Sequence, residues 1–524
     1  MCLIPLLGGV ARSAGVGALS CAAALARLQL AELAALLPGD LACRRQNWRF
    51  LRFFHARRAY WHDRSLVVLA SRSDTVHRWC YPIDTVHRAK LGNGTGIQRV
   101  TMLTSIQAYL KITTSAASGD WFIQKEGAIT MRSVPQLDLS RQYETLREEM
   151  LEAVDSIFKT GNVIMGQNVD RLEDEIAAFI GVKHGIGAAS GSDALLIALR
   201  AMKIEEGDLV LTTPYTFFST VSAITRNGGD PVFVDIDPAT FNMNLDHVEE
   251  ILQHHPHRNK IKAIIPVHLF GQTVDLERLE AIREEYGLKI LEDAAQSIGS
   301  TWQYSDGTRK ISGSIGDACI LSFFPSKNLG AYGDAGMILT SNDPIAQFCR
   351  MYRVHGARQK YVHEVVGINS RLDEIQAAVL RIKLKHLEYY NKKRREIAAQ
   401  YARLFDKLLP SASSTSSNDA PIVYPDVPSD SSHVFHQYVI RVNKGHRDQL
   451  RDYLTENRIG TSIYYPIPLH LQRCFRSLGY REGILPVSEQ SARETLALPI
   501  FPEMTEEEVD YVVTKIAEFF KVNT

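Results

Sequence analysis

This sequence lacks three features that would indicate a membrane protein, a nucleic-acid-binding protein, or a protein with disulfide bonds or a metal site. It has no uninterrupted run of 18 apolar residues, which argues against a membrane span. Lys and Arg total 59 and Asp and Glu also total 59, so the chain lacks the basic excess typical of a protein that binds nucleic acid. The seven cysteines include no CxxC pair, so we expect neither a disulfide framework nor a metal site, and we expect a reduced, cytoplasmic setting.

The first 130 residues differ from the remainder. They carry 16 Lys and Arg against 7 Asp and Glu, and residues 41–130 show no sustained apolar period. Residues 1–40 are rich in Ala and Leu and contain no acidic residue before Glu32, which a secretory signal or an organelle transit peptide would also show. Met131 begins a segment that reads like a natural protein start. We expect 1–130 to be an N-terminal extension, poorly ordered or not native, whose removal leaves activity intact.

From residue 131 onward, short apolar strands alternate with amphipathic helices. This alternation predicts an α/β fold with a mainly parallel sheet, helices on both faces, and ligands at the carboxyl ends of the strands. We expect a large domain at 131–390 and a smaller C-terminal α/β domain at 391–524, with a Ser-rich loop at 410–421. The expected strands are 185–189, 209–212, 231–235, 263–267, 289–292, 318–323 and 437–442. The expected helices are 141–159, 169–179, 193–202, 218–227, 245–254, 276–286, 371–388, 391–409 and 447–457.

A phosphate-binding turn is expected at Gly191-Ser192-Asp193, where the first of these strands leads into a helix. The free N–H groups and the positive end of the helix dipole suit a phosphate, and Ser192 adds a hydroxyl. The alternative is ordinary N-capping by Ser192 or Asp193. The neighbouring glycines do not have the spacing of a dinucleotide fingerprint, which argues against a nicotinamide dehydrogenase.

Asp293 and Gln296 follow the apolar strand 289–292. An acidic residue at a strand end is usually just solvated. A cofactor that contains a pyridine ring, however, needs a carboxylate at its ring nitrogen, because a protonated nitrogen makes the ring an electron sink. Asp293 is the candidate for that carboxylate, and Gln296 could reach a hydroxyl on the ring.

Lys327 lies in a glycine-rich segment that begins at Ser322 and follows the strand 318–323. A lone lysine in such a turn is usually exposed. Here the preceding apolar strand suggests that the base of its side chain is buried, and burial favours the neutral amine that a Schiff base requires.

A fourth segment, Gly367 to Ala378, is a loop that runs into a helix, and its simplest explanation is a capped helix with Asn369 or Ser370 as the cap. The order of the four segments is more informative than each of them. A phosphate turn, then an acid, then a lysine on a parallel sheet is the layout of a fold-type I enzyme that uses pyridoxal 5'-phosphate.

Several longer motifs follow one another along the chain: PYTFFSTVSAI, PVFVDIDPATFNMN, EDAAQSIG, SFFPSKNLGAYGDAG and GINSRLDEIQAAVL. These motifs resemble the DegT/DnrJ/StrS family of sugar aminotransferases, which have the aspartate aminotransferase fold. The resemblance runs from about Met131 to the C-terminus. Within it, two segments are most similar to the 3-keto-sugar aminotransferases, which include the WbpE type: RVHGARQKYVHEVVGINSRLD and IYYPIPLH. Ala335 departs from the usual glycine of the family, Ser192 from the usual threonine, and Tyr464 from the histidine of the WbpE type.

The resemblance implies a role for each matching residue. Lys327 would form the Schiff base and move the proton, and Asp293 would pair with the ring nitrogen. The other implied contacts are Gln296 at the ring oxygen, Phe217 on the ring face, Ser192, Asp193 and Ser322 around the phosphate, and Arg371, Tyr464 and Tyr465 facing the nucleotide sugar. Asn369 would reach the phosphate from the other subunit, so the resemblance implies a homodimer with shared active sites.

The implied reaction has two halves. An amino acid, expected to be L-glutamate, gives its nitrogen to pyridoxal phosphate, and a nucleotide-linked keto sugar then takes it, at C3 by resemblance, for surface polysaccharide or secondary-metabolite sugars. One alternative is a pyridoxal-phosphate-dependent sugar dehydratase, which carries histidine in place of the lysine. Another is a non-catalytic regulatory protein. Lys327 argues against the dehydratase, and the intact Lys327, Asp293 and Gln296 argue against the regulator.

Overall fold

The structure is a computed structural model that describes residues 55–62, 65–72, 75–82, 111–114, 121–124, 133–414 and 420–523. The chain divides into two compact units, Met1–Ile129 and Thr130–Thr524. The first unit contains an antiparallel sheet of β1 (His55–His62), β2 (Ser65–Arg72) and β3 (Thr75–Pro82), and a hairpin of β4 (Lys111–Thr114) and β5 (Trp121–Gln124). The sequence did not predict these strands. Most of 1–130 lies outside the described residues, so the expected character of this extension stays a prediction.

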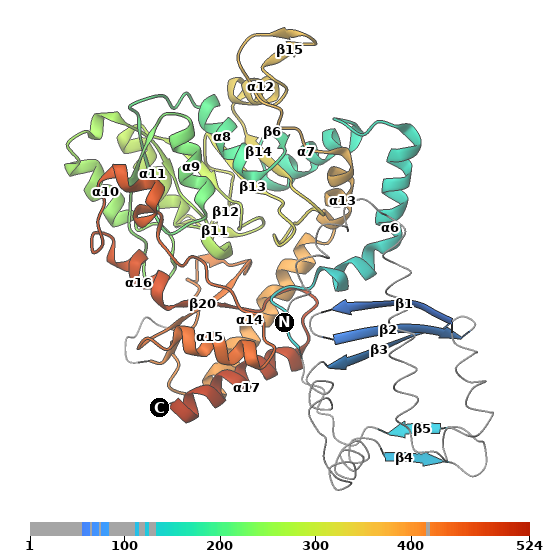
Figure 1. Ribbon diagram of the computed structural model, residues 1–524. Coiled ribbons are helices and arrows are strands. Elements are labelled where there is room, and N and C mark those ends of the chain that lie inside the picture. Colours follow the sequence, from blue (N-terminus) through green and yellow to red (C-terminus); the bar gives the residue numbers. More distant parts are fainter. Residues whose placement is uncertain are drawn as a thin grey trace, which may run out of the picture. The chain divides into compact units, whose positions relative to one another are not determined.

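A seven-stranded sheet forms the centre of the second unit (Figure 1). Five neighbouring strands, β13 to β8, are mutually parallel, whereas β14 runs antiparallel to both of its neighbours. The mainly parallel α/β fold expected from the sequence is therefore confirmed. In sheet order the strands are β6 (His184–Ala188), β14 (Gly336–Thr340), β13 (Ala318–Ser322), β10 (Lys289–Asp293), β9 (Ile261–Ile265), β7 (Leu209–Thr212) and β8 (Asp230–Phe233).

Helices cover both faces of this sheet because successive strand residues point to opposite sides. In β10, Leu291 belongs to a core that contains α8 (Gly191–Ala201), α9 (Phe218–Arg226) and α12 (Asp343–Tyr352). Its neighbour Ile290 belongs to the opposite core, which contains α10 (Leu245–His254) and α11 (Leu276–Tyr286). On that side, further along the sheet, lie α7 (Gln167–Ile180) and α13 (Glu374–Leu384), and α6 (Leu139–Thr160) packs on α13.

Local signals set several helix ends. α11 begins after Asp275, whose carboxylate accepts the Arg278 N–H at 3.0 Å, and it ends at Gly287, whose φ of 64° is in the left-handed region. The helix 371–388 was predicted too long at both ends. Asp373 is the N-cap residue of α13, and Ser370, proposed as a cap, instead accepts the Ala189 N–H at 3.1 Å. The proposal that Ser370 or Asn369 caps this helix is therefore wrong.

The C-terminal part, which holds the small sheet with β20 (Thr495–Leu498; Figure 1), has its own apolar core between that sheet and three helices. Val134 joins this core, and it pairs with Ile459 in a parallel bridge. The sheet has the order β17 (Ile422–Val423), β19 (Tyr438–Val442) and β20 (Thr495–Leu498). The helices of this core are α14 (Leu387–Leu408), α15 (Arg447–Glu456) and α17 (Glu506–Asn523). α16 (Pro486–Glu494) precedes β20 and contributes Ala492 to a different apolar cluster.

Shorter elements complete the fold. Among the described residues, no helix has both the length and the apolar character needed to cross a bilayer. The remaining strands are β11 (Thr301–Gln303), β12 (Arg309–Ile311), β15 (Ala357–Gln359), β16 (Val362–His363) and β18 (Ser431–Ser432). The short 3-10 helices are η1 (Arg258–Lys260), η2 (Leu269–Gly271), η3 (Leu469–Leu471) and η4 (Arg473–Leu478).

Candidate active site

Lys327 lies in a tight turn directly after β13. The backbone N–H of Lys327 donates to the carbonyl of Phe324 at 2.8 Å, which closes the turn. A Cβ atom at Gly330 would come within 2.4 Å of the Pro325 carbonyl oxygen, so the return of the chain requires glycine there. From α13, the buried ammonium of Lys383 donates to the Gly330 carbonyl. The turn that carries Lys327 is thus fixed from within and from a neighbouring helix.

The Lys327 amine is largely removed from water, although the residue keeps partial solvent access. This desolvation lowers the pKa of the Lys327 amine from 10.5 to about 8, and the negative charge of Asp293 opposes the shift. Burial disfavours the ammonium form, so the neutral amine is available near neutral pH. A neutral amine within reach of solvent is what attack on an aldehyde requires.

Asp293 ends β10 and is buried. Its carboxylate accepts the Thr220 hydroxyl at 2.8 Å and the Ala295 N–H at 3.3 Å. Burial raises the pKa of Asp293, and these hydrogen bonds together with the charge of Lys327 lower it, with a net upward shift. A buried carboxylate whose charge is incompletely compensated is suited to receive a cation such as a protonated ring nitrogen.

The first turn of α9 connects three parts of the site. Thr220 donates to Asp293, and the Ser219 hydroxyl lies 2.5 Å from the Ser192 hydroxyl. Phe217 precedes the helix with 58% of its surface exposed, and its ring centroid is 6.4 Å from that of Tyr465. Ser219 and Thr220 were not predicted from the sequence. The signal available was their position at the start of an expected helix within the matching motif 214–224.

The N-terminus of α8 lies beside the end of β13. Ser190 is its N-cap residue and accepts the Asp193 N–H at 3.1 Å, so the suggestion that Ser192 or Asp193 caps this helix is wrong. A Cβ atom at Gly191 would come within 2.7 Å of the Ser322 Cβ. Ser192 and Ser322 therefore flank a free helix N-terminus, which is an arrangement suited to a phosphate group.

Gln296 and Tyr465 form a hydrogen-bonded pair, and Tyr465 lies within the electrostatic influence of Asp293. The Gln296 carbonyl accepts the Phe270 N–H at 2.8 Å, and its amide group donates to the Tyr465 hydroxyl at 3.3 Å. Burial raises the pKa of Tyr465, so this phenol stays protonated near neutral pH. The carbonyl of Tyr464 accepts the Tyr215 hydroxyl at 2.6 Å, which fixes the backbone of this pair.

Asn369 and Arg371 are the least connected of the predicted residues. Asn369 is exposed and forms an antiparallel bridge with Val354. Arg371 is partly exposed and makes no ion pair with any residue that the structure describes. Their loop abuts β6, because a Cβ atom at Gly187 would meet the Leu372 side chain at 2.8 Å. In the described part of the chain, neither side chain forms a hydrogen bond or ion pair with the other predicted residues.

The residues around Lys327 fit pyridoxal phosphate. A desolvated amine, a buried carboxylate lacking a full counter-charge, an exposed aromatic ring and a helix N-terminus flanked by hydroxyls match the aldehyde, ring nitrogen, ring face and phosphate of this cofactor. Within the described ranges no group of three or more His, Cys, Asp or Glu side chains is placed to hold a metal ion. This fold and this site define a pyridoxal-phosphate-dependent aminotransferase.

Comparison with known proteins identifies the family. The chain belongs to the DegT/DnrJ/EryC1/StrS aminotransferase family, which matches residues 144–517. The family depends on pyridoxal phosphate, and its members are sugar aminotransferases. The fold, the cofactor and the enzyme class expected from the sequence are therefore confirmed.

The matches to individual relatives cover nearly the whole length of each relative. The pleiotropic regulatory protein of Geobacillus stearothermophilus is 49% identical over 74% of this chain and 99% of that protein. The UDP-N-acetyl-3-dehydro-alpha-D-glucosamine 3-aminotransferase of Acidithiobacillus ferrooxidans is 39% identical over 73% of this chain and 97% of that enzyme. The structure of S. venezuelae DesV in complex with a ketimine intermediate is 35% identical, with a TM-score of 0.67 over 74% of this chain and 98% of that chain.

Proposed function

We propose that this enzyme transfers the amino group of L-glutamate to the C3 keto group of a nucleotide-linked sugar. The observation that carries the proposal is the Lys327 amine, whose pKa is lowered by burial, within the electrostatic influence of the buried Asp293 carboxylate. The relative from Acidithiobacillus, by its name a 3-aminotransferase of a UDP-linked 3-keto sugar, supports this substrate class. The product would be an amino sugar for a surface polysaccharide or a secondary metabolite.

Each residue of the site has a proposed task. Bound pyridoxal phosphate supplies an aldehyde and a ring that withdraws electrons. Lys327 holds the cofactor through its amine and afterwards carries a proton to and from the substrate carbon. Asp293 keeps the ring nitrogen protonated. Gln296 directs the amide hydrogen that Tyr465 does not use toward the ring oxygen, since its carbonyl accepts from Phe270. Phe217 covers the ring face.

The phosphate and the sugar would lie on opposite sides of Lys327. Ser192 and Ser322, with Asp193 in the same helical turn, would hold the phosphate at the start of α8. Tyr464 and Tyr465 would face the sugar. Arg371 supports the assignment of an anionic substrate, because its guanidinium has no carboxylate partner within the described residues.

We propose a homodimer in which Asn369 reaches the cofactor phosphate of the partner subunit. Its exposure, and its lack of contact with the other site residues, favour a role across an interface. Mixing subunits tests this. Lys327→Ala and Asn369→Ala homodimers should both be impaired, and reassociation of an equal mixture should restore about a quarter of the wild-type sites, one per hybrid dimer. No recovery in verified hybrids would mean that Asn369 serves its own subunit.

The extension and the location are further proposals. We propose that residues 131–390 form the cofactor-binding domain, that 391–524 form the smaller domain, and that 1–130 are dispensable. A protein that begins at Met131 should be soluble and fully active, and an inactive one would refute this. We propose a cytoplasmic location, because Cys319, Cys349 and Cys474 are free thiols, as expected in a reducing compartment.

An absorbance experiment tests the function. The wild-type protein should bind pyridoxal phosphate with the visible band of a lysine-linked cofactor, and L-glutamate should convert that band to the near-ultraviolet band of the amine form. Lys327→Ala should lose the first band, whereas Lys407→Ala, at an exposed lysine on α14, should keep both. Nucleotide-linked 3-keto sugars should then restore the visible band.

The same experiment addresses the second candidate, a non-catalytic regulator, which the name of the Geobacillus relative suggests. A protein that binds pyridoxal phosphate yet shows no spectral change with any amino acid would favour the regulator. A change with L-glutamate that only 4-keto sugars reverse would keep the aminotransferase and refute the C3 assignment.

A further inference from the structure

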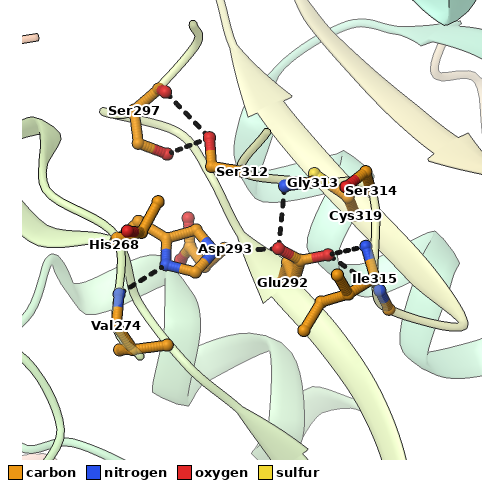
Figure 2. A network of polar contacts seen from close by, with 12 residues as sticks. His268, Val274, Glu292, Asp293, Ser297, Ser312, Gly313, Ser314, Ile315 and Cys319 are labelled. Carbon is orange, nitrogen blue, oxygen red and sulfur yellow. Dashed lines mark hydrogen bonds and ion pairs between the residues drawn. The ribbon is translucent and has the colours of Figure 1, made fainter. Parts of the chain in front are cut away.

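A buried acid and a buried histidine lie directly beside Asp293, and the proposed reaction does not use them (Figure 2). Glu292 precedes Asp293 on β10 and is 0% exposed, as is His268. Adjacent strand residues point to opposite faces, so the Glu292 side chain is directed away from that of Asp293. A charged group without solvent contact is costly unless its neighbours satisfy it, so its partners show what it is for.

Glu292 accepts four hydrogen bonds. One carboxylate oxygen accepts the Ile315 N–H at 2.9 Å and the Gly316 N–H at 2.7 Å. The other accepts the Gly313 N–H at 2.7 Å and the His268 Nε2–H at 3.0 Å. These four donors fill the acceptor positions of a carboxylate and include no acceptor for a carboxyl proton, so Glu292 is ionised.

His268 has one defined proton arrangement. Its Nδ1 accepts the Val274 N–H at 3.3 Å, so the ring proton is on Nε2, which donates to Glu292. Figure 2 shows the imidazole held between Val274 on one side and Glu292 on the other. The pair is therefore a carboxylate and a neutral imidazole, each oriented by backbone groups.

This pair connects the three chain segments that surround Asp293. The His268 N–H donates to the Asp293 carbonyl at 3.1 Å, and the Asp293 N–H donates to the Pro266 carbonyl at 2.9 Å. Pro266 and His268 follow β9, Glu292 and Asp293 end β10, and residues 313–316 precede β13. The backbone N–H and the backbone carbonyl of Asp293 are thus both hydrogen-bonded to residues 266–268. The contact between Glu292 and His268 attaches that same segment to β10.

We propose that Glu292 and His268 are positioning residues that fix the Asp293 carboxylate opposite the ring nitrogen of pyridoxal phosphate; the proposal rests on the proposed role of Asp293. Neither residue touches the cofactor. They act by holding the backbone of Asp293 from both sides, so that the carboxylate does not need to reorganise as charge develops on the ring.

Glu292→Gln tests the proposal with almost no change in volume. The glutamine carbonyl can still accept from Ile315 and Gly316, but its NH₂ group then faces two other donors, those of Gly313 and His268. The single-turnover rate constant with L-glutamate should fall roughly 10- to 100-fold, the range found when outer groups that orient functional side chains are removed from metal sites. The KM for L-glutamate should change little. His268→Gln can keep the donor to Glu292 and should retain more activity than His268→Leu.

Ser312→Ala is the matched control. Ser312 is equally buried and belongs to the same turn. Among the residues that the structure describes, its hydroxyl bonds only to Ser297, at 2.8 Å to the carbonyl and 2.9 Å to the hydroxyl (Figure 2). Removing it loosens the turn without touching the Glu292–His268 contact. The rate constant should stay within about threefold of wild type. An equal loss in Ser312→Ala and Glu292→Gln would show general loosening and overturn the proposal.

A double variant separates positioning from support of the fold. If Glu292 acts through Asp293, then Glu292→Gln should cost nothing further once Asp293→Asn is present, because the two effects share one route. A double variant slower by the full product of the two single effects would overturn the proposal, as would Glu292→Gln at the wild-type rate. An unimpaired Asp293→Asn would instead refute the role of Asp293 itself, which distinguishes failure of the proposed function from failure of this inference.

Discussion

The pH dependence of cofactor capture by Lys327 follows from the environment of its amine. The pKa is lowered from 10.5 to about 8 by desolvation. At pH 7 a lysine of pKa 10.5 is roughly 0.03% neutral, whereas one of pKa 8 is roughly 10% neutral, a difference of about 300-fold. Only the neutral amine attacks an aldehyde, so the capture rate should rise with pH and level off above a midpoint near pH 8.

Asp293→Asn predicts the direction in which this midpoint moves. The Asp293 charge stabilises the Lys327 ammonium and so raises its pKa. Removing that charge leaves the desolvation unopposed, the pKa falls further, and the midpoint shifts to lower pH. Asp174→Asn, at an exposed position on α7, is the control and should leave the midpoint unchanged.

Stopped-flow absorbance of the cofactor-free protein mixed with pyridoxal phosphate, from about pH 6 to about pH 10, measures the midpoint. A value near 10, as for an exposed lysine, would show that the amine is solvated and would refute the reasoning. A midpoint that rises in Asp293→Asn would refute the charge argument alone, because desolvation of Lys327 does not depend on that carboxylate.

Three further predictions concern other contacts. Arg353→Met removes one partner of the buried ion pair with Glu173, whose shortest N–O distance is 2.5 Å. The free energy of unfolding, measured in urea, should fall by about 3 to 5 kcal/mol, and a loss under about 1 kcal/mol would contradict this. Glu374→Ala leaves the N–H groups of residues 166, 168 and 169 without their acceptor. The free energy of unfolding in urea should fall by at least about 3 kcal/mol, and an unchanged value would argue that water replaces the carboxylate. Gly191→Ala places a Cβ 2.7 Å from the Ser322 Cβ and should weaken binding of pyridoxal phosphate by about tenfold or more in an absorbance titration, and an unchanged Kd would place the phosphate elsewhere.

Local sequence signals predicted the elements that they fully determine. The helix expected at 276–286 coincides with α11, because an aspartate cap and a left-handed glycine mark its two ends. The strand at 209–212 coincides with β7, a short apolar run between turns. The start of α13 was misplaced because Ser370 serves Ala189, far away in the sequence, and a distant hydrogen bond leaves no local signal.

β14 shows a different limit of the sequence. Its five residues, Gly336–Thr340, follow the glycine-rich turn around Lys327, and a run this short does not distinguish a strand from a helix. Its antiparallel direction depends on how the chain returns after that turn. Pairing with β13 and β6 decides its position, and both partners lie elsewhere in the chain.

The chemistry of the site was more predictable than its support. Lys327 and Asp293 could be predicted as candidates because the proposed chemistry requires an acid and a lysine in that order on a sheet. Thr220 and Ser219 were missed because hydroxyls in a first helical turn usually satisfy the helix itself. Glu292 was missed because an acid near a strand end is usually solvated, and only the folded chain shows that it is 0% exposed.

Val134 has a consequence for how the chain folds during synthesis. It belongs to a core whose other buried members all lie in residues 397–520. The ribosome synthesises those partners last. Val134 therefore has no residues of this core to pack against while the strands and helices of the central sheet have already emerged. The central sheet can therefore form first, and the C-terminal core can pack only when nearly all of the chain has emerged. A nascent chain arrested before α17 should hold a folded sheet with an unprotected segment at Val134, open to a protease.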